Sequence, residues 1–500
     1  MIQGTGSGAG KSLLVTALCR ILTDVGLNVA PYKSQNMALN SFITACGGEI
    51  GRAQALQAEA ARLAPTVAMN PILLKAQGES GCQVIIHGKV HKSMKAREYY
   101  AFRDQAWAAA KSSFDELSEK HGIIIIEGAG SPAEINLMDV DIVNMSVAKY
   151  AKAPVLLVGD IDKGGVFASL YGTVKLLGRD KRRVRGFIIN KFRGDMEILR
   201  PGLDMIRDKT GTPVVGVLPY FDRSGLPEED GMALSHETAV ARFAVPMQSI
   251  KLVILRLQYI SNFTDFDPLL LEPDVELVYS SNPTEIENAD MVIIPGTKNT
   301  VKDLHFLRKT GLDKSIARAH EKGVRIVGIC GGYQMLGRRI YDPDGIESPH
   351  REVEGLGLLN IETNFANTKT TCRVEAKLAG TCFPFSAAHN GDVALLNGYE
   401  IHMGTSSGDI GLFRILRSGQ QDELPDGSGD AGCWGTYIHG IFDNDIFRRG
   451  IINDLRAGKG LSPLETGINY AAIRSRAIDR LAAIVKNNID IDFVSGLLKL

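Results

Sequence analysis

The sequence predicts an α/β protein with two doubly wound parallel sheets, each covered by helices on both faces. Short apolar runs rich in Val and Ile end in glycine-rich turns, and helical patterns follow several of them. Strands that alternate with helices form parallel sheets, whose functional groups gather at the carboxyl ends of the strands. Two of the turns carry reactive groups: a glycine-rich loop ending in Lys11-Ser12, and a Gly-x-Cys-x-Gly turn around Cys330.

Length and composition set the broad class. The 500 residues predict two or three domains, and 56 basic against 57 acidic residues favour neither a nucleic-acid nor a membrane partner. The seven cysteines show no paired C-x-x-C spacing, so we expect neither a disulfide framework nor a structural zinc site. No apolar run reaches membrane-spanning length, and no signal peptide is visible. We therefore expect a cytoplasmic protein, and a homo-oligomer is compatible with the sequence.

The first motif is a phosphate-binding loop from Gly4 to Ser12. Backbone N–H groups of such a loop wrap phosphate oxygens, while Lys11 adds positive charge and Ser12 can bind Mg²⁺. A helix over residues 13–22 would point its N-terminus at the phosphates. Counted from Gly4, the loop is longer by one residue than the usual Walker pattern.

Later strand ends should surround this loop. Lys33 ends a predicted strand, and Glu127 follows an apolar run at a strand tip, where a carboxylate beside glycines suits a Mg²⁺-phosphate site. The alternatives are a solvated lysine and a helix-capping acid. Asn190 stands at a strand tip typical of nucleotide-base recognition. The predicted ATP-binding residues are Gly4, Thr5, Gly10, Lys11, Ser12, Lys33 and Asn190, the predicted metal ligands are Ser12 and Glu127, and Asp141, Asp160 and Asp162 are further candidates.

A polar, loop-rich stretch over residues 220–246 marks the predicted domain boundary. It divides the chain into a first domain over residues 1–235, a second α/β domain over 249–446 and a C-terminal helical segment over 447–500. The polar stretch between residues 34 and 41 is predicted to be a loop.

The second motif places Cys330 between an apolar run and a helical pattern. Gly-x-Ser-x-Gly is the strand-to-helix elbow that exposes a nucleophilic serine, and a cysteine takes the serine position here. A thiol beside a helix N-terminus is favoured as the reactive thiolate. The alternative is a buried structural cysteine, which is how we interpret the other six.

The second domain also supplies groups that could work with Cys330. Gly296 follows a predicted strand and, with Gly331, offers backbone N–H groups to an oxyanion. Gln334 lies one helical turn beyond Cys330, on the same side. A nucleophilic cysteine needs a base, and His402 and His439, each predicted to end a strand, are both candidates.

These residues resemble known families. Residues 328–334, GICGGYQ, with His439 resemble the class I glutamine amidotransferase domain, and the phosphate loop with Tyr32-Lys33 and residues 127–130, EGAG, resembles the dethiobiotin-synthetase type of carboxylate-activating domain. The two in this order resemble the cobyric acid synthase family. The strings SQNMALNS, GRAQALQAEAA, EGAGSPAEINL, DIVNM, INKFRGD, ISNFTDFDPL, GICGGYQMLG and GYEIHMG extend this resemblance over nearly the whole chain. It implies a P-loop NTPase-like fold followed by a flavodoxin-like one.

The family resemblance implies a reaction and residue roles. The reaction is amidation of the b, d, e and g carboxylates of adenosylcobyrinic acid a,c-diamide, using ATP, Mg²⁺ and glutamine and no tightly bound organic cofactor. By resemblance, Cys330 is the glutaminase nucleophile, His439 its base, and Gly296 and Gly331 the oxyanion donors. Asp141 lies in a segment where the family has a functional aspartate.

The sequence departs from related patterns at several positions. Ile441 stands where most class I relatives have a glutamate two residues after the histidine, so what orients His439 stays open. Gly8 stands where the family usually has aspartate. The alternative functions are cobyrinic acid a,c-diamide synthase and a partitioning-type ATPase switch with an inactive second domain. Such switches usually carry a second lysine early in the loop, whereas residues 5–7 are Thr-Gly-Ser.

Overall fold

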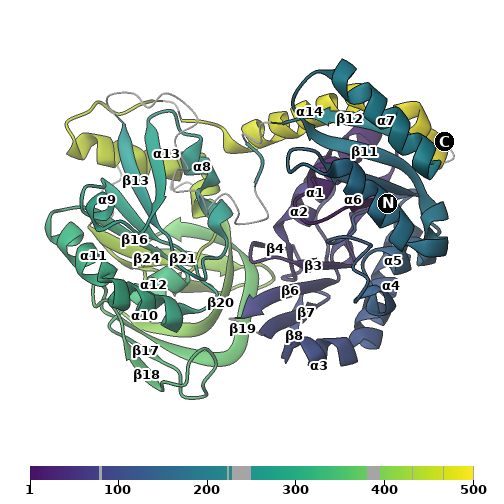
Figure 1. The fold of residues 1–500 in the computed structure, drawn as a ribbon. Helices are drawn as coiled ribbons and strands as arrows, with labels where there is room; N and C mark the ends of the chain where they lie inside the picture. Colours follow the sequence, from purple (N-terminus) through teal and green to yellow (C-terminus); the bar gives the residue numbers. More distant parts are fainter. Residues whose placement is uncertain are drawn as a thin grey trace. The chain divides into compact units, whose positions relative to one another are not determined.

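The computed structural model describes residues 1–77, 81–221, 225–227, 249–379, 395–430, 432–465 and 467–498. The chain divides into two compact units (Figure 1). Unit 1 comprises Met1–Ala38, Gly48–Glu229 and Arg474–Leu500, and unit 2 comprises Leu39–Gly47 and Asp230–Ile473. This division differs from the predicted domains, because residues 39–47 belong to unit 2. The predicted C-terminal segment 447–500 is divided, with residues up to Ile473 in unit 2 and Arg474–Leu500 in unit 1. Most of the predicted boundary stretch lies outside the described residues.

Unit 1 is organised on a parallel sheet in the order β2-β9-β1-β10-β11-β12. A parallel bridge between Ile2 and Glu127 joins its two halves. The strands are β1 (Ile2–Gly4), β2 (Val29–Tyr32), β9 (Ile123–Ile126), β10 (Val155–Asp160), β11 (Val184–Phe192) and β12 (Val214–Pro219). Such continuous apolar runs suit strands that are buried on both faces.

Helices cover both faces of this sheet, because successive residues of the central strand β10 pack into two different hydrophobic cores. Leu156 and Val158 of β10 pack in a core with α1 and α14, whereas Val155 and Leu157 pack in another with α6 and α7. Successive strand residues point to opposite faces, so the predicted doubly wound arrangement is confirmed for unit 1. The helices are α1 (Lys11–Asp24), α2 (Arg52–Ala60), α4 (Arg103–Lys120), α5 (Met145–Tyr150), α6 (Val166–Leu176), α7 (Met196–Thr210), α14 (Tyr470–Asn488) and α15 (Ile491–Leu498).

A second, smaller sheet in unit 1 was not predicted. It has the order β3-β6-β7-β8, and α3 (Ala96–Ala101) follows it. Its strands are β3 (Gln35–Met37), β6 (Ile72–Gln77), β7 (Gly81–Ile86) and β8 (Lys89–Lys95). The prediction that residues 34–41 form only a loop is therefore wrong, since β3 pairs with β6 from far along the chain. That tertiary pairing supplies the hydrogen bonds that the polar local sequence does not suggest.

Unit 2 has a sheet in the order β14-β13-β15-β16-β24-β23, of which the first five strands are parallel. Numbered along the chain, those five follow the 2-1-3-4-5 order of flavodoxin-like folds, as predicted. The strands are β13 (Ile250–Leu255), β14 (Val275–Ser280), β15 (Met291–Ile294), β16 (Arg325–Ile329), β23 (Ser428–Gly429) and β24 (Cys433–Thr436). The helices are α8 (Asp267–Leu270), α9 (Pro283–Glu287), α10 (Thr300–Thr310), α11 (Leu312–Glu321), α12 (Gly331–Leu336) and α13 (Asp445–Gly458).

Unit 2 also contains a largely antiparallel sheet that the sequence did not indicate. It is formed by β17 (Arg339–Tyr341), β18 (Glu352–Glu354), β19 (Ile361–Leu378), β20 (Leu396–Gly408), β21 (Phe413–Arg417) and β22 (Glu423–Asp426). Long pairing between β19 and β20 carries the strand beyond His402. The prediction that a strand ends at His402 is therefore wrong.

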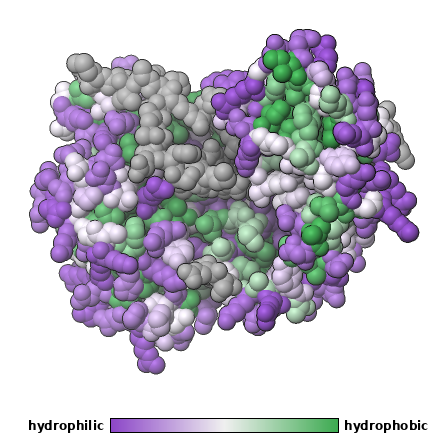
Figure 2. Space-filling view, in the orientation of Figure 1, coloured by the Kyte–Doolittle hydropathy of each residue, from purple (hydrophilic) through white to green (hydrophobic). Residues whose placement is uncertain are grey.

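The face of the molecule that Figure 2 shows is mainly polar. On the face in Figure 2, hydrophilic residues cover most of the outline and hydrophobic residues appear in separate patches. Among the residues that the structure describes, no helix combines the length and apolar character needed to cross a membrane.

Arg448 anchors α13 inside unit 2. It is fully buried, and its Nε donates to Glu272 Oε1 at 2.7 Å while its other nitrogens bind Asp445 and the carbonyls of Phe442 and Ile468. A buried guanidinium is tolerated because its donors are paired.

We predict that Arg448→Met destabilises unit 2 by about 3–5 kcal/mol, because Glu272 would lose a partner inside the core. Calorimetric unfolding measures this change. The matched control is Arg207→Met, since Arg207 also pairs with two acids but is half exposed, and we expect a change of at most about 1 kcal/mol. Equal losses in both variants would contradict the role of burial.

Candidate active sites

The phosphate loop follows β1 and is closed by lysine contacts to its own backbone. Lys11 is buried, and its Nζ donates to the carbonyls of Gly6 at 2.9 Å and Gly130 at 3.1 Å. Gly4 ends β1, and the N–H of Thr5 donates to Val158 on β10 at 2.9 Å. The ammonium group thus lies between the loop and the segment after β9.

Gly10 is required where the loop enters α1. Its φ of 98° is in the left-handed region, and a Cβ there would lie only 2.0 Å from Nδ2 of Asn190. That amide donates to the carbonyl of Ala9 at 2.8 Å. The structure therefore places Asn190 against the phosphate loop, which it supports, and its predicted contact with the base stays a prediction.

Glu127 is the buried acid of this site. Its Oε1 accepts from Lys33 Nζ and Ser12 Oγ, both at 2.8 Å, and its Oε2 accepts from Gln57 Nε2 at 2.5 Å. Burial opposes ionisation, but the charge of Lys33 and the hydrogen bonds from Lys33 and Gln57 outweigh it and hold the pKa of Glu127 below its ordinary value. The site therefore contains an ionised carboxylate near Lys11 and Lys33, the two lysines that were predicted to bind ATP.

Ser12 and Glu127 fit a magnesium ion by the chemistry of their donors. Their hydroxyl and carboxylate oxygens are 2.8 Å apart, and Mg²⁺ in phosphate sites takes one or two protein oxygens together with waters and phosphate oxygens. The low pKa of Glu127 keeps the carboxylate in the form that binds metal.

The other predicted acids of unit 1 have different surroundings. Asp160 ends β10 and forms an ion pair with Lys191 at 2.7 Å, while Asp162 lies near the surface with Arg193 at 3.6 Å. Asp141 accepts hydrogen bonds from three backbone N–H groups, of Val143, Asn144 and Ser146, at 2.8–2.9 Å. Asp141 thus shapes the turn that leads into α5.

The turn around Cys330 is built by close backbone contact. A Cβ at Gly332 would lie 1.9 Å from the carbonyl oxygen of Ile294, and one at Gly328 would lie 2.7 Å from Gly332. Both glycines of the motif are therefore needed for α12 to pack against β15 and β16. Cys330 has a φ of 53°, which is rare for a residue with a side chain and typical of functional positions.

Three elements bring Cys330, His439 and Gly296 together. A Cβ at Gly296 would lie 3.0 Å from Cε1 of His439 and 3.8 Å from Cβ of Cys330. Gly296 follows β15, Cys330 follows β16, and His439 follows β24, so all three lie at the carboxyl edge of neighbouring parallel strands. Gly331 opens α12, where the first backbone N–H groups of a helix have no intrahelical partner.

His439 is held by Asp265, which the sequence analysis missed. Nδ1 of His439 lies 2.6 Å from Oδ2 of Asp265, and the backbone N–H of Gly440 donates to Oδ1 at 3.2 Å. The ring of Tyr399 stacks on the imidazole with centroids 5.3 Å apart. Burial lowers the pKa of His439, but the charges of Asp265 and Cys330 and hydrogen bonds to both raise it to about 10.

Asp265 belongs to a short 3-10 helix, η5 (Phe263–Phe266), far from His439 in the chain. Asn262 and Asn40 support this segment, because Phe263 N donates to Asn40 Oδ1 at 3.1 Å and Asn262 Oδ1 accepts from Ser41 N at 3.3 Å. The only sequence signal was the family-like string ISNFTDFDPL, which contains Asp265 without indicating its partner.

Gln334 and His402 are each held by several contacts, and both contact Tyr437. The Gln334 amide hydrogen-bonds to Thr300 Oγ1 at 3.1 Å, to the carbonyl of Met403 at 2.9 Å and to Tyr437 OH at 3.2 Å. His402 lies 3.2 Å from Glu400 and stacks on Tyr437. Gln334 thus ties α12 to α10 and β20, and the contacts favour His439 over His402 as the base.

Comparisons with known proteins identify a family model for each half of the chain. Residues 1–234 match the CobQ/CobB/MinD/ParA nucleotide-binding domain, and residues 251–447 match the CobB/CobQ-like glutamine amidotransferase domain. A cobyric acid synthase of Thermodesulfovibrio yellowstonii is 49% identical over 99% of this chain and 98% of its own length. Another, from Caldanaerobacter subterraneus subsp. tengcongensis, is 50% identical over 100% of this chain and 98% of its own length.

Each of these alignments covers nearly the whole of this chain and 98% of the relative's length. The matched domains are those that the phosphate loop and the Cys330 turn indicated. The chain therefore belongs to the cobyric acid synthase family, ligases that carry a glutamine amidotransferase domain.

Proposed function

We propose that this chain catalyses the ATP- and glutamine-dependent amidation of the b, d, e and g carboxylates of adenosylcobyrinic acid a,c-diamide. The observation that carries the proposal is the presence of two sites with complementary chemistry on one chain. Unit 1 gathers Lys11, Lys33 and Glu127 around a phosphate loop, and unit 2 gathers Cys330 and His439 at a strained turn. A free thiol at Cys330, and ATP and glutamine as substrates, fit a reaction in the cytoplasm.

Ammonia would be released in unit 2. With a pKa of about 10, His439 is an imidazolium near neutral pH, and its positive charge lies beside the Cys330 sulfur. The sulfur attacks the carboxamide carbon of glutamine, and backbone N–H groups of Gly296 and Gly331 would stabilise the oxyanion. His439 gives its proton to the leaving amine, and water then hydrolyses the thioester to glutamate.

The acceptor would be activated in unit 1. A carboxylate oxygen attacks the γ-phosphorus of ATP, the bond to the bridging oxygen breaks, and ADP leaves with that electron pair. Ammonia then attacks the acyl phosphate, and phosphate leaves as the nitrogen loses a proton. Lys11 and Lys33 would offset the negative charge that accumulates between donor and acceptor. Magnesium, held by Ser12 and Glu127, would supply further positive charge on the phosphates.

The number of amidations distinguishes the proposed reaction from that of cobyrinic acid a,c-diamide synthase. We expect the purified chain with adenosylcobyrinic acid a,c-diamide, ATP and glutamine to form a product with four new amides. Each step replaces a hydroxyl group by an amino group, so mass spectrometry counts the steps. Full-length identity to cobyric acid synthases supports four. A product without added amides from this substrate would reject the proposal.

We predict that Cys330→Ser reduces glutamine-dependent amidation by roughly 10³-fold or more, because a serine hydroxyl stays protonated near neutral pH. Amidation from concentrated ammonium chloride at mildly alkaline pH should continue, since unit 1 is unchanged. The matched control is Cys433→Ser, in the neighbouring strand β24 and equally buried. The control should keep glutamine hydrolysis. Glutamine-dependent activity in Cys330→Ser would show that another group is the nucleophile.

We predict that Asp265→Asn lowers glutamine hydrolysis by about 10²-fold and moves its alkaline limit to lower pH. Without the Asp265 charge, burial would lower the pKa of His439 from about 10. Because folding raises the pKa of His439, the wild type gains stability at pH values below the pKa of the unfolded chain, which is near 6.5. This contribution to stability is lost as the pH rises towards 10. The variant's melting temperature should therefore fall less than that of the wild type across this range.

The control for this prediction is Asp274→Asn. Asp274 is as buried as Asp265 but pairs with Arg449 and Arg456. It should lose stability without a shift in the pH profile of glutamine hydrolysis. An unchanged pH profile in Asp265→Asn would mean that Asp265 does not control His439.

A further inference from the structure

A cavity of about 620 Å³ lies within unit 1, beside the phosphate loop. Ser7 of the loop lines it, and so does Gly130, whose carbonyl accepts from Lys11 Nζ at 3.1 Å. Its other walls come from β3, β6, β7 and α3 and from the segment between β9 and α5. The steps proposed above for ammonia release and phosphoryl transfer assign no role to this cavity. Asp141, a candidate residue from the sequence, is among the residues that line it.

The order of the strands places the cavity on one side of the phosphate loop. The loop follows β1, and the cavity walls follow β9 and β2, which lie on one side of β1 in the sheet. Asn190 ends up on the other side, on β11 beyond β10. A nucleotide with its phosphates in the loop and its base towards Asn190 would leave the cavity free for the molecule that accepts the γ-phosphoryl group.

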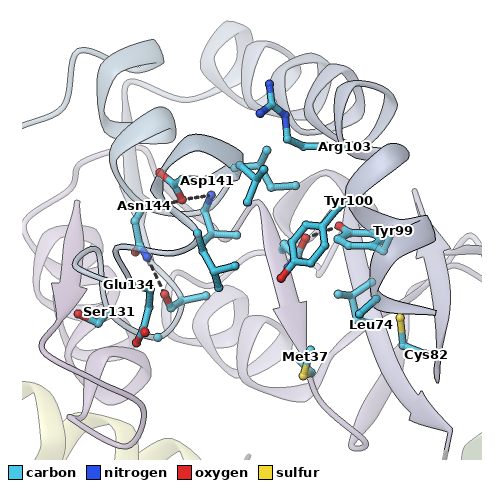
Figure 3. A pocket seen from close by; sticks show the side chains of 18 of the residues that line it. Met37, Leu74, Cys82, Tyr99, Tyr100, Arg103, Ser131, Glu134, Asp141 and Asn144 are labelled. Atoms are coloured by element: carbon cyan, nitrogen blue, oxygen red, sulfur yellow. Dashed lines mark hydrogen bonds between the residues drawn. The ribbon is translucent and has the colours of Figure 1, made fainter. Parts of the chain in front are cut away.

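Figure 3 shows the side chains that line the cavity. Met37, Leu74, Tyr99 and Tyr100 form one side, and Met37 and Tyr100 leave 66% and 45% of their surface exposed although they are large and apolar or aromatic. Such exposed apolar groups in a concave site are typical of a place where a ligand binds. Arg103 lines the same cavity, and its partly exposed guanidinium donates to the carbonyl of Asp139 and pairs with Asp104 at 3.3 Å.

The opposite wall combines apolar residues, among them Leu137, Met138 and Val140, with polar side chains that already have contacts of their own. Asp141 accepts three backbone hydrogen bonds, and Asn144 Nδ2 donates to the carbonyl of Ala129 at 2.7 Å. Glu134 adds a further negative charge on this side (Figure 3). The carboxylates of an anionic ligand would therefore be favoured on the side of Arg103, whose planar guanidinium can bind a carboxylate with two parallel hydrogen bonds.

We infer that this cavity is the corrinoid site, and the inference rests on the proposed function. A corrin is a flat, mainly apolar ring with a rim of short carboxylate and amide groups. The cavity volume is in the range of small-molecule sites, and its apolar wall suits the ring face. At Ser7 and Gly130, which line the cavity, one rim carboxylate would face the γ-phosphate.

The same lining suits four successive amidations. Each step requires a different part of the rim to face the phosphate loop, so the site must hold the ring without fixing one side group. Met37 and Met138 have flexible, polarisable side chains that adapt to different shapes, and the two tyrosines offer flat faces. Recognition of the shared ring by adaptable apolar groups allows the substrate to bind in four orientations.

The test is Met37→Glu, which places a negative charge on the apolar wall, with Met205→Glu on α7 as the control because Met205 is 62% exposed. Binding of adenosylcobyrinic acid a,c-diamide is measured by equilibrium dialysis, together with ATP binding and glutamine hydrolysis. We expect at least a tenfold weaker corrinoid affinity in Met37→Glu, with the other two properties changed less than twofold. Met205→Glu should match the wild type in all three. Tyr100→Ala, which adds no charge, should also weaken corrinoid binding.

Each other outcome overturns a distinct statement. If the wild type amidates the corrinoid but neither Met37→Glu nor Tyr100→Ala weakens its binding, the cavity is not the corrinoid site. If Met37→Glu weakens ATP binding and leaves the corrinoid unaffected, the cavity holds the nucleotide base. If the wild type neither binds nor amidates the corrinoid, the proposed function is wrong and the cavity assignment falls with it. Retained glutamine hydrolysis and an unchanged melting temperature establish that the variants are folded.

Discussion

The hydrogen bond between His439 and Asp265 sets the charge of the histidine that lies beside Cys330, and the proposed glutaminase site of unit 2 depends on it. A buried histidine is ordinarily neutral, because burial disfavours its charged form. The carboxylate 2.6 Å away reverses that preference and keeps the proton on the imidazole. The same acid accepts the N–H of Gly440, so it fixes both the charge and the backbone position of the histidine. In the proposed glutaminase reaction, the strained turn would present the Cys330 sulfur beside this imidazolium.

In unit 1 the buried group that must stay charged is an acid, Glu127. Glu127 is almost completely buried, and a lone buried carboxylate would take up a proton. Lys33, Ser12 and Gln57 supply hydrogen bonds and one positive charge, so the acid stays ionised. In both units the charged groups lie where parallel strands end, because that edge leaves backbone groups and side chains free of sheet hydrogen bonds.

The proposed corrinoid cavity extends this arrangement. Its walls come from a small sheet and a loop outside the main sheet of unit 1, elements that nucleotide binding alone does not require. Ser7 of the phosphate loop lines the cavity, and so does Gly130, which accepts a hydrogen bond from Lys11, so the donor and acceptor of the phosphoryl group would meet there. An apolar wall can hold a large ring in several orientations, whereas a set of fixed polar contacts would select one.

The sequence by itself determined the two parallel sheets and the groups at their edges. Buried parallel strands have continuous apolar runs, and the turns after them must contain glycine, so Lys11, Glu127 and Cys330 could be identified from local patterns. The sequence also predicted the partnership of Cys330 with His439, although only through the family resemblance. Apolar strand runs are visible locally in the sequence. The phosphate loop and the Cys330 turn are short motifs with a characteristic spacing.

Only the tertiary structure decided what lies between those motifs. Asp265 is remote from His439 in the chain and sits in a short 3-10 helix without a spacing rule, so its role required the folded arrangement. The strand β3 is polar and pairs with a distant strand, and the cavity beside it is assembled from several separate segments. Pairings and cavities of this kind depend on which surfaces meet after folding, and periodicity along the chain carries no record of them.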